Sequence, residues 1–389
     1  MTNPNIHFTR EEFENRQYRT RAYLDEQNLD GLLLFKIEDM YWLTGFDSDG
    51  FCIFHSMFVG VNGELTHLSR TADLANVAYS SICEDVRIAP DDAELRWSSC
   101  IKDMLVSHGM QGKRIGIQVD TMGLTPKLFL EIQAELEGCC ELVVADNFIQ
   151  KMRMVKSEQE LAYHRKAGEI LDIALGDALL AVQPGAYEGD IYGAFYNKLF
   201  SMGADLPAHI PPLGCGESAL NVRYTSGRKY LVENDQLTLE LGLAYRHYHA
   251  GSMCVALIGP EISELHLKMH AALVPALAAI QDLLRPGKTM GEVYDAYRMI
   301  VTDHGLGHTL QDACGYTMGA TWPPTWMEQP MFYKGNPTVI ETNMTFFNML
   351  ILNDFESGLI MCLGEQTIIT DGQPEVITHV PREPIVVGA

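Results

Sequence analysis

The chain has 389 residues, of which 47% are hydrophobic and 20% are charged, as in ordinary globular proteins. This length predicts two domains rather than one. The formal net charge of −23 repels phosphate and argues against a nucleic-acid partner; it favours a cationic substrate, or it reflects only a solvated acidic surface.

The chain carries no sign of export or of a membrane anchor. Residues 1–27 are charged throughout and contain no apolar run, so they predict no secretory signal. No later stretch has the length of a membrane helix. Nine scattered cysteines form no CxxC pair, which indicates reduced thiols rather than disulfides or a zinc site. We therefore expect a cytoplasmic protein without membrane contact.

The N-terminal part alternates helices with buried strands. Helical spacing covers residues 11–28 and 126–138, and apolar runs at 30–36 and 114–120 are typical of buried strands. Between them, apolar runs separated by Gly, Asp and Asn predict strands, loops and a hairpin. This alternation predicts a small α/β domain over residues 1–155.

A second domain begins with a long helix from residue 157 to 182. Ser157 and Glu160 form the pattern of a capping box at its start. The remaining helical and strand-like runs are at 187–202, 262–284 and 290–304, and at 236–245, 251–258, 344–351 and 359–370. Long helices mixed with antiparallel hairpins predict an α+β domain over residues 156–389.

Three segments of this second domain resemble one superfamily in their order and spacing. They are KMRMVKSEQELAYHRKA (151–167), PLGCGESALNVRYTSGRKYLVENDQLTLELGLAYRHYHAG (212–251) and RPGKTMGEVYDAYRMIVTDHGL (285–306). They resemble the creatinase, aminopeptidase P and prolidase superfamily, whose catalytic domain has the pita-bread fold. The resemblance covers essentially the whole chain and implies a creatinase-type N-terminal domain before a pita-bread domain.

The peptidases of this superfamily bind two divalent metals through two Asp, one His and two Glu. By the resemblance, these ligand positions fall on Glu240, Gly251 or Ser252, Tyr316, Met349 and Glu365. Carboxylates and imidazoles are the ligands that such metals need. Since only two acids remain, the resemblance implies a member without a metal, and we expect no other cofactor.

Losing the metals does not imply losing catalysis, because creatinase and ectoine hydrolase resemble this superfamily and act without metals. The segments MYWLTGFDSD (40–49), ELGLAYRHYHA (240–250) and GYTMGATWPPTW (315–326) are nearer to ectoine hydrolase. This resemblance implies hydrolysis of a non-peptide C–N bond in a small zwitterionic amidine or amino-acid derivative. Glu240 would be the nucleophile, since a buried carboxylate suits an amidinium carbon both by charge and by reactivity.

Further candidates surround Glu240 in this interpretation. Glu365 is expected on the strand facing it, as an acid/base or as a group that orients the substrate nitrogen. His249 is a candidate catalyst, although strand histidines are more often structural. Arg223 stands where the family commonly has a catalytic His and is expected to bind the substrate carboxylate. The other candidate substrate-binding residues are Asp47, Phe46, Trp42, Tyr248, Tyr316 and Trp322.

Two alternatives remain open. A creatinase-like amidinohydrolase would need a histidine as base, and Arg223 weighs against it because arginine stays protonated. A non-catalytic binding protein on a degenerate peptidase scaffold would need no intact site. In either catalytic case the resemblance implies a small-molecule substrate and a homodimer, in which the partner's N-terminal domain lies near the site.

Overall fold

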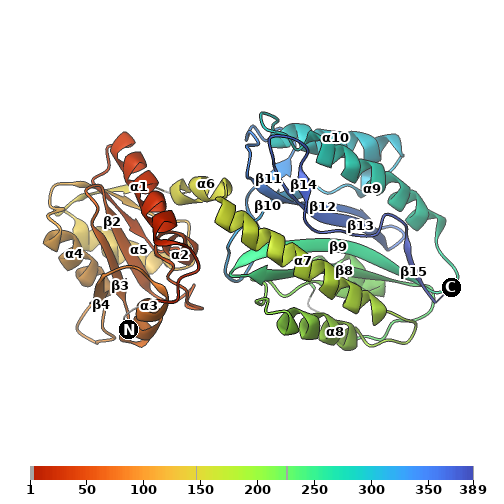
Figure 1. Cartoon of the computed structure of the whole chain (residues 1–389), viewed down its shortest axis with the longest axis horizontal. Helices are drawn as coiled ribbons and strands as arrows, with labels where there is room; N and C mark the ends of the chain where they lie inside the picture. The colour runs from red at the N-terminus through yellow and green to blue at the C-terminus, as the bar shows by residue number, and fades with distance from the viewer. Residues whose placement is uncertain (1–3, 146, 225–226, 389) are drawn as a thin grey trace. The chain divides into compact units, whose positions relative to one another are not determined.

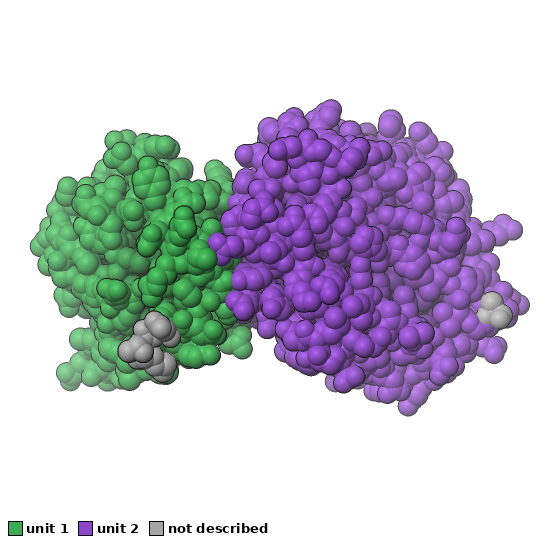
Figure 2. Space-filling view, viewed as in Figure 1, with its two compact units in different colours: residues 1–153 green, residues 154–389 purple. Residues whose placement is uncertain are grey.

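The computed structural model describes residues 4–145, 147–224 and 227–388, and the chain divides into two compact units. Unit 1 spans Met1–Arg153 and unit 2 spans Met154–Ala389; Figure 2 colours them green and purple. Within the described residues, no helix combines the length and the apolar character that crossing a membrane requires.

Unit 1 is a six-stranded sheet with helices (Figure 1). In spatial order the strands are β4 (Asp85–Ile88), β3 (Leu65–Ser69), β2 (His55–Gly60), β1 (Gly31–Leu34), β5 (Arg114–Ile117) and β6 (Glu141–Val144). Strand β2 is antiparallel to both neighbours, and the other pairs are parallel. The helices are α1 (Arg10–Glu26), α2 (Ile37–Thr44), α3 (Leu74–Ser80), α4 (Trp97–Ser107), α5 (Pro126–Leu136) and α6 (Phe148–Met154). This confirms the predicted small α/β domain.

Unit 2 contains a nine-stranded sheet built from long antiparallel strands. Seven strands follow one another as β11 (Glu328–Tyr333), β10 (Ala313–Thr317), β12 (Thr345–Asp354), β13 (Leu359–Ile368), β9 (Tyr248–Ile258), β8 (Asp235–Tyr245) and β7 (Leu213–Cys215). Two short strands, β14 (Glu375–Val376) and β15 (Ile385–Val387), pair with β13 and β9.

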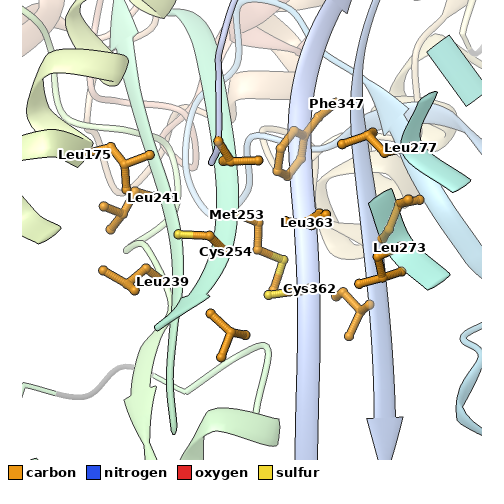
Figure 3. Close-up of a cluster of buried hydrophobic side chains, with 14 of the residues drawn as sticks. Leu175, Leu239, Leu241, Met253, Cys254, Leu273, Leu277, Phe347, Cys362 and Leu363 are labelled. Atoms are coloured by element: carbon orange, nitrogen blue, oxygen red, sulfur yellow. The ribbon is translucent and has the colours of Figure 1, made fainter. Parts of the chain in front are cut away.

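Four long helices pack on this sheet: α7 (Glu158–Leu180), α8 (Glu188–Ser201), α9 (Glu264–Leu283) and α10 (Met290–Asp303). The capping box predicted for α7 is present. The Ser157 side chain accepts a hydrogen bond from the backbone N–H of Glu160, and the Glu160 side chain accepts one from the backbone N–H of Ser157. Figure 3 shows a cluster of buried hydrophobic side chains on the sheet, in which Leu175 of α7 lies beside Leu241, and Leu273 and Leu277 of α9 lie on the other side of the cluster. Helices and antiparallel strands together confirm the α+β prediction for this unit.

Candidate active site

Glu240 shares one face of the sheet with three apolar residues. In the strand register it pairs with Met253, which pairs with Gly364, which pairs with Met349. Directly opposed residues point to the same side of a sheet, and the next residue along a strand points to the other side. We call the side that carries Glu240, Met253, Gly364 and Met349 the inner face.

The opposite side is the helix face, and its side chains form the packed core. Leu239 and Leu241 flank Glu240 in β8 and are fully buried. Cys254 lies with them on the side of Leu175 of α7, whereas the Met253 side chain runs toward Cys362 (Figure 3). The alternation of acid and leucine in β8 therefore separates a core face from a face that holds a carboxyl group.

The carboxyl group of Glu240 is buried without a local partner. The residue is 6% exposed, while its neighbours in the strand are 0% exposed. Among the described residues it forms no side-chain hydrogen bond and no ion pair. Burial raises its pKa to about 8, and the charge of Arg223 opposes this shift. A buried polar group with no partner is costly, which is typical of a functional position rather than of a core position.

Aromatic side chains lie around Glu240 on the inner face. The Tyr316 hydroxyl accepts a hydrogen bond of 2.8 Å from Trp326 Nε1. Burial, reinforced by the charge of Glu240, raises the pKa of Tyr316 well above its usual value, so the hydroxyl stays protonated. The Trp326 ring lies against Gly242, where a Cβ atom would be 3.0 Å from Trp326 Cζ3. Tyr316 therefore lies within reach of the charge of Glu240 and is hydrogen-bonded to Trp326, and its contact with substrate stays a prediction.

Phe347 covers two glycines of the inner face. A Cβ atom on Gly251 would lie 3.3 Å from Phe347 Cδ2, and one on Gly364 would lie 2.8 Å from Phe347 Cζ. The ring also meets that of Tyr316 edge-on at 5.7 Å between centroids. Because the ring fills this space, a side chain larger than that of glycine fits at neither position unless Phe347 shifts.

These residues do not fit a pair of divalent metals. Of the inner-face side chains around Glu240, Met253, Met349 and Phe347 offer no oxygen or imidazole nitrogen. Within the described residues, no three His, Cys, Asp or Glu side chains come together as a metal site would require. A hard or borderline cation needs several such ligands, and Glu240 supplies only one.

Arg223 and His209 lie on two loops of unit 2, where the charge of Arg223 reaches Glu240 and the His209 ring contacts Trp326. Arg223 acts on Glu240 through its charge, but among the described residues the two form no direct ion pair. The His209 ring is half-buried, contacts the Trp326 ring edge-on at 5.4 Å, and bonds to the backbone of Pro324. Burial, and then the charge of Arg223, lowers its pKa. His209 was absent from the sequence candidates because a single histidine in a Pro-rich loop shows no periodic pattern.

The expectation that Glu365 faces Glu240 is wrong. Gly364, its neighbour, is the residue in register with Glu240, so Glu365 points to the helix face. There its carboxylate accepts hydrogen bonds of 2.8 and 2.7 Å from Arg382, 2.8 Å from Gln281 of α9, and 3.0 Å from the Val380 N–H. Glu365 is a fully paired buried acid that connects the C-terminal segment to α9.

His249 and Tyr248 both make structural contacts, on opposite faces of the sheet. The Ala208 N–H donates to His249 Nε2 at 2.8 Å, and His249 Nδ1 lies 3.3 Å from the Gly319 carbonyl. Burial lowers the pKa of His249 to about 3, so the ring stays neutral. Tyr248 donates to Glu160 of α7 at 2.7 Å, on the helix face. Tyr248 thus points away from Glu240, whereas His249 lies on the inner face with its ring centroid 6.5 Å from that of Trp326, and its catalytic role stays a prediction.

The remaining candidates also have local packing roles. Trp322 stacks on His247 at 3.9 Å between ring centroids, at the turn between β8 and β9. In unit 1, Trp42 and Phe46 are buried, with Arg16 5.2 Å from the Trp42 ring centroid and His67 4.4 Å from that of Phe46. The Asp47 N–H donates to Ser80 at 2.9 Å. Their proposed contact with substrate stays a prediction.

Comparison with known proteins places this geometry in a family. The chain matches the metallopeptidase family M24 over residues 162–370 and the creatinase/prolidase N-terminal domain over residues 16–155. Ectoine hydrolase of Halomonas elongata is 25% identical over 98% of this chain and 99% of its own. A Xaa-Pro dipeptidase of Pyrococcus horikoshii is 22% identical over 77% of this chain and 81% of its own.

The fold matches solved structures over nearly the full length. Dipeptidase PepE from Mycobacterium ulcerans superposes with a TM-score of 0.84 at 20% identity, covering 98% of this chain and all of that one. A prolidase from Thermococcus sibiricus gives 0.85 at 18% identity, covering 96% and 99%. These similarities confirm the pita-bread fold and the recognition of the superfamily. The chain belongs to metallopeptidase family M24, with a creatinase/prolidase N-terminal domain before its M24 domain.

Proposed function

We propose that this chain is a metal-independent hydrolase of a non-peptide C–N bond in a small zwitterionic amidine, with Glu240 as the nucleophile. The observation that carries the proposal is the lone, unpartnered carboxyl group of Glu240 among aromatic rings and residues that do not bind metals. The full-length similarity to ectoine hydrolase supports this class over a peptidase. Ectoine is therefore the first substrate to test.

Charge explains how such a substrate would activate Glu240. With a pKa of about 8, the carboxyl group is mostly protonated at neutral pH. An amidinium placed beside it favours the carboxylate, because an opposite charge at close range lowers the pKa of an acid. The charge of Arg223 acts on Glu240, and among the described residues the two form no ion pair. In the proposed complex, the cation of the zwitterion binds at Glu240 and its carboxylate binds at Arg223.

The proposed reaction proceeds in two steps. A carboxylate oxygen of Glu240 bonds to the amidinium carbon. One C–N bond of that carbon then breaks as its nitrogen takes the proton given up by the other nitrogen and leaves as an amine, and a C=N bond forms to the nitrogen that remains. Water then attacks the same carbon, the C–O bond to Glu240 breaks, and the carboxylate returns with release of an amide. His209 is our candidate for removing the proton of this water, because it lies near the site and a lowered pKa keeps it neutral.

Intact-protein mass spectrometry with ectoine tests the covalent step. We expect wild-type protein to consume ectoine, and His209→Gln to accumulate an adduct that fragmentation places on Glu240. Glu240→Gln should lose at least about a hundredfold in kcat, since it cannot form the ester-like intermediate. An active Glu240→Gln variant would disprove the nucleophile.

Glu365→Gln is the matched control, because it alters an acid of the same type in the same sheet but on the helix face. It should lower stability and leave the kcat of the folded protein within about twofold of wild type, as expected for a residue away from the chemistry. Binding of ectoine without turnover would favour the non-catalytic alternative. Turnover that appears only with added Mn²⁺ and stops with a chelator would contradict metal independence.

A further inference from the structure

The segment from Asp205 to Pro212 lies beside β8 and is bound to it at both ends. The Asp205 N–H donates to the carbonyl of Ala244 at 2.7 Å, and the Ala244 N–H donates back to the carbonyl of Asp205 at 3.1 Å. At the other end, the Glu240 N–H donates to the Pro212 carbonyl at 2.9 Å. His209 therefore lies between two attachments to the strand that carries Glu240.

A side chain of β9 binds the middle of this segment. The Ala208 N–H donates to His249 Nε2 at 2.8 Å. Ala208 is buried, and a buried backbone N–H needs an acceptor within the protein. Because this bond fixes the plane of the peptide group before Ala208, it also restricts the backbone from which the next residue, His209, projects.

The contacts of the His249 ring determine which of its nitrogens carries the hydrogen. Nε2 accepts a backbone N–H, so it presents a lone pair and carries no hydrogen. Nδ1 therefore carries the hydrogen, with the Gly319 carbonyl oxygen at 3.3 Å and the Thr321 hydroxyl oxygen at 3.2 Å. Contacts at both nitrogens hold the ring in the orientation in which it accepts from Ala208.

Trp326 connects this arrangement to the inner face. The His209 ring meets the Trp326 ring edge-on at 5.4 Å between centroids, and the His249 ring centroid lies 6.5 Å from that of Trp326. The Trp326 ring in turn covers Gly242, which is two residues from Glu240 in β8 and on the same face. The ring that contacts His209 therefore also borders the inner face.

We propose that His249 is a positioning residue, which binds the Ala208 N–H and thereby fixes the ring of His209 against Trp326 at the inner face. The inference rests on the proposed function only in taking His209 as the group that removes a proton from water. It gives His249 a role that acts through another histidine, in place of a role as an acid or base of its own.

Two substitutions of His249 separate these two roles. A glutamine side chain reaches about as far as Nε2 of histidine and offers an amide oxygen as acceptor, whereas an asparagine side chain reaches only about as far as Nδ1. His249→Gln should therefore keep the bond to Ala208, and His249→Asn should lose it. Neither amide transfers a proton at neutral pH, so a role as acid or base predicts that both variants lose activity equally.

Modification of His209 by diethyl pyrocarbonate tests the proposal without any substrate. Mass spectrometry of peptides gives the rate at His209, with the exposed His304 at the end of α10 as internal control. We expect His249→Asn to raise the rate at His209 about threefold or more, because its segment opens more often, and to leave the rate at His304 unchanged. His249→Gln should match wild type at both sites. If His249→Asn does not fold, Ala208→Pro removes the N–H donor and should give the same rise.

Turnover of ectoine provides a second readout. His249→Asn should lower kcat about tenfold, lower KM with it and accumulate the adduct on Glu240, as expected when the second step is slowed. His249→Gln should stay within about twofold of wild type in kcat, since it restores the acceptor. An equal loss of kcat in both variants, or an unchanged rate at His209 in folded His249→Asn, would overturn the proposal. If no amidine is hydrolysed, the proposed function fails, while the rate of modification still decides the role of His249.

Discussion

Glu240 carries a cost that the leucines on either side of it in β8 do not. Its neighbours bury leucine side chains, whereas Glu240 buries a carboxyl group that lacks a hydrogen-bond partner among the described residues. Such a group destabilises the folded state once the pH rises above the pKa of the unfolded chain. Functional residues commonly impose this kind of cost, because a site prepared for a ligand is not satisfied without it.

Glu240→Gln should therefore stabilise the protein, and more so at higher pH. The folded-state pKa is about 8, against a model value of 4.5. Below pH 4.5 the carboxyl group of Glu240 is protonated in both the folded and the unfolded state. Between pH 4.5 and pH 8, the free energy of unfolding falls as the pH rises, by at most about 1.4 kcal/mol per pH unit. Urea unfolding at pH 5 and at pH 8 measures this. An equal effect of the variant at both pH values would contradict it.

The resemblance pointed to Glu240, Tyr316 and Arg223, but not to Phe347 or His209. Glu240 stands in a motif of recognisable order, so its position followed from the resemblance. Glu365 was placed on the wrong face because a shift of one residue along a strand moves every side chain to the other side. The register that decides between Gly364 and Glu365 depends on pairing with β9, which is remote in sequence.

At the scale of the element, the inner face depends on glycines that accept aromatic rings. Gly242 makes room for Trp326, and Gly251 and Gly364 make room for Phe347. Sequence patterns placed these strands within a few residues of their observed ends, since long apolar runs determine strands reliably. They did not show which glycines the rings of Trp326 and Phe347 cover, because packing between strands and loops leaves no periodic signal.

Gly364→Ala should destabilise the sheet by about 1–3 kcal/mol, the range for overpacking a buried site. Its Cβ would lie 2.8 Å from Phe347 Cζ and 2.9 Å from Met253 Cβ. Combining it with Phe347→Leu should recover part of the loss by relieving the clash with the ring. Chemical denaturation of the single and double variants measures both effects.

Gly176→Ala is the control for this experiment. Gly176 lies within α7, and a Cβ there would meet no atom within 4 Å. Alanine should stabilise that helix by up to about 1 kcal/mol, because it has the higher helix propensity. If Gly364→Ala were equally harmless, Phe347 would not fill the space above the glycine, and the argument against a metal at this position would weaken.

At the scale of the whole molecule, both units bury neutral histidines. In unit 1, burial and then the charge of His55 lower the pKa of His67 to about 3. In unit 2, burial and then Lys156 lower the pKa of His164 to the same value. Neither His67 ring nitrogen has a hydrogen-bond partner in the described structure. Such histidines favour folding only while they stay neutral.

Stability should therefore decline as the pH falls below about 6.5. A folded-state pKa of about 3 lies below the model value of 6.5, so the full contribution is present above 6.5 and is lost progressively between 6.5 and 3. Each histidine adds about 1.4 kcal/mol per pH unit to this decline. His67→Phe should reduce the pH dependence of the stability of unit 1, and His164→Gln should reduce that of unit 2. Each variant serves as the control for the other unit. Hydrogen exchange followed by mass spectrometry resolves the units by segment, and a slope that neither variant changes would show that other groups govern the acid response.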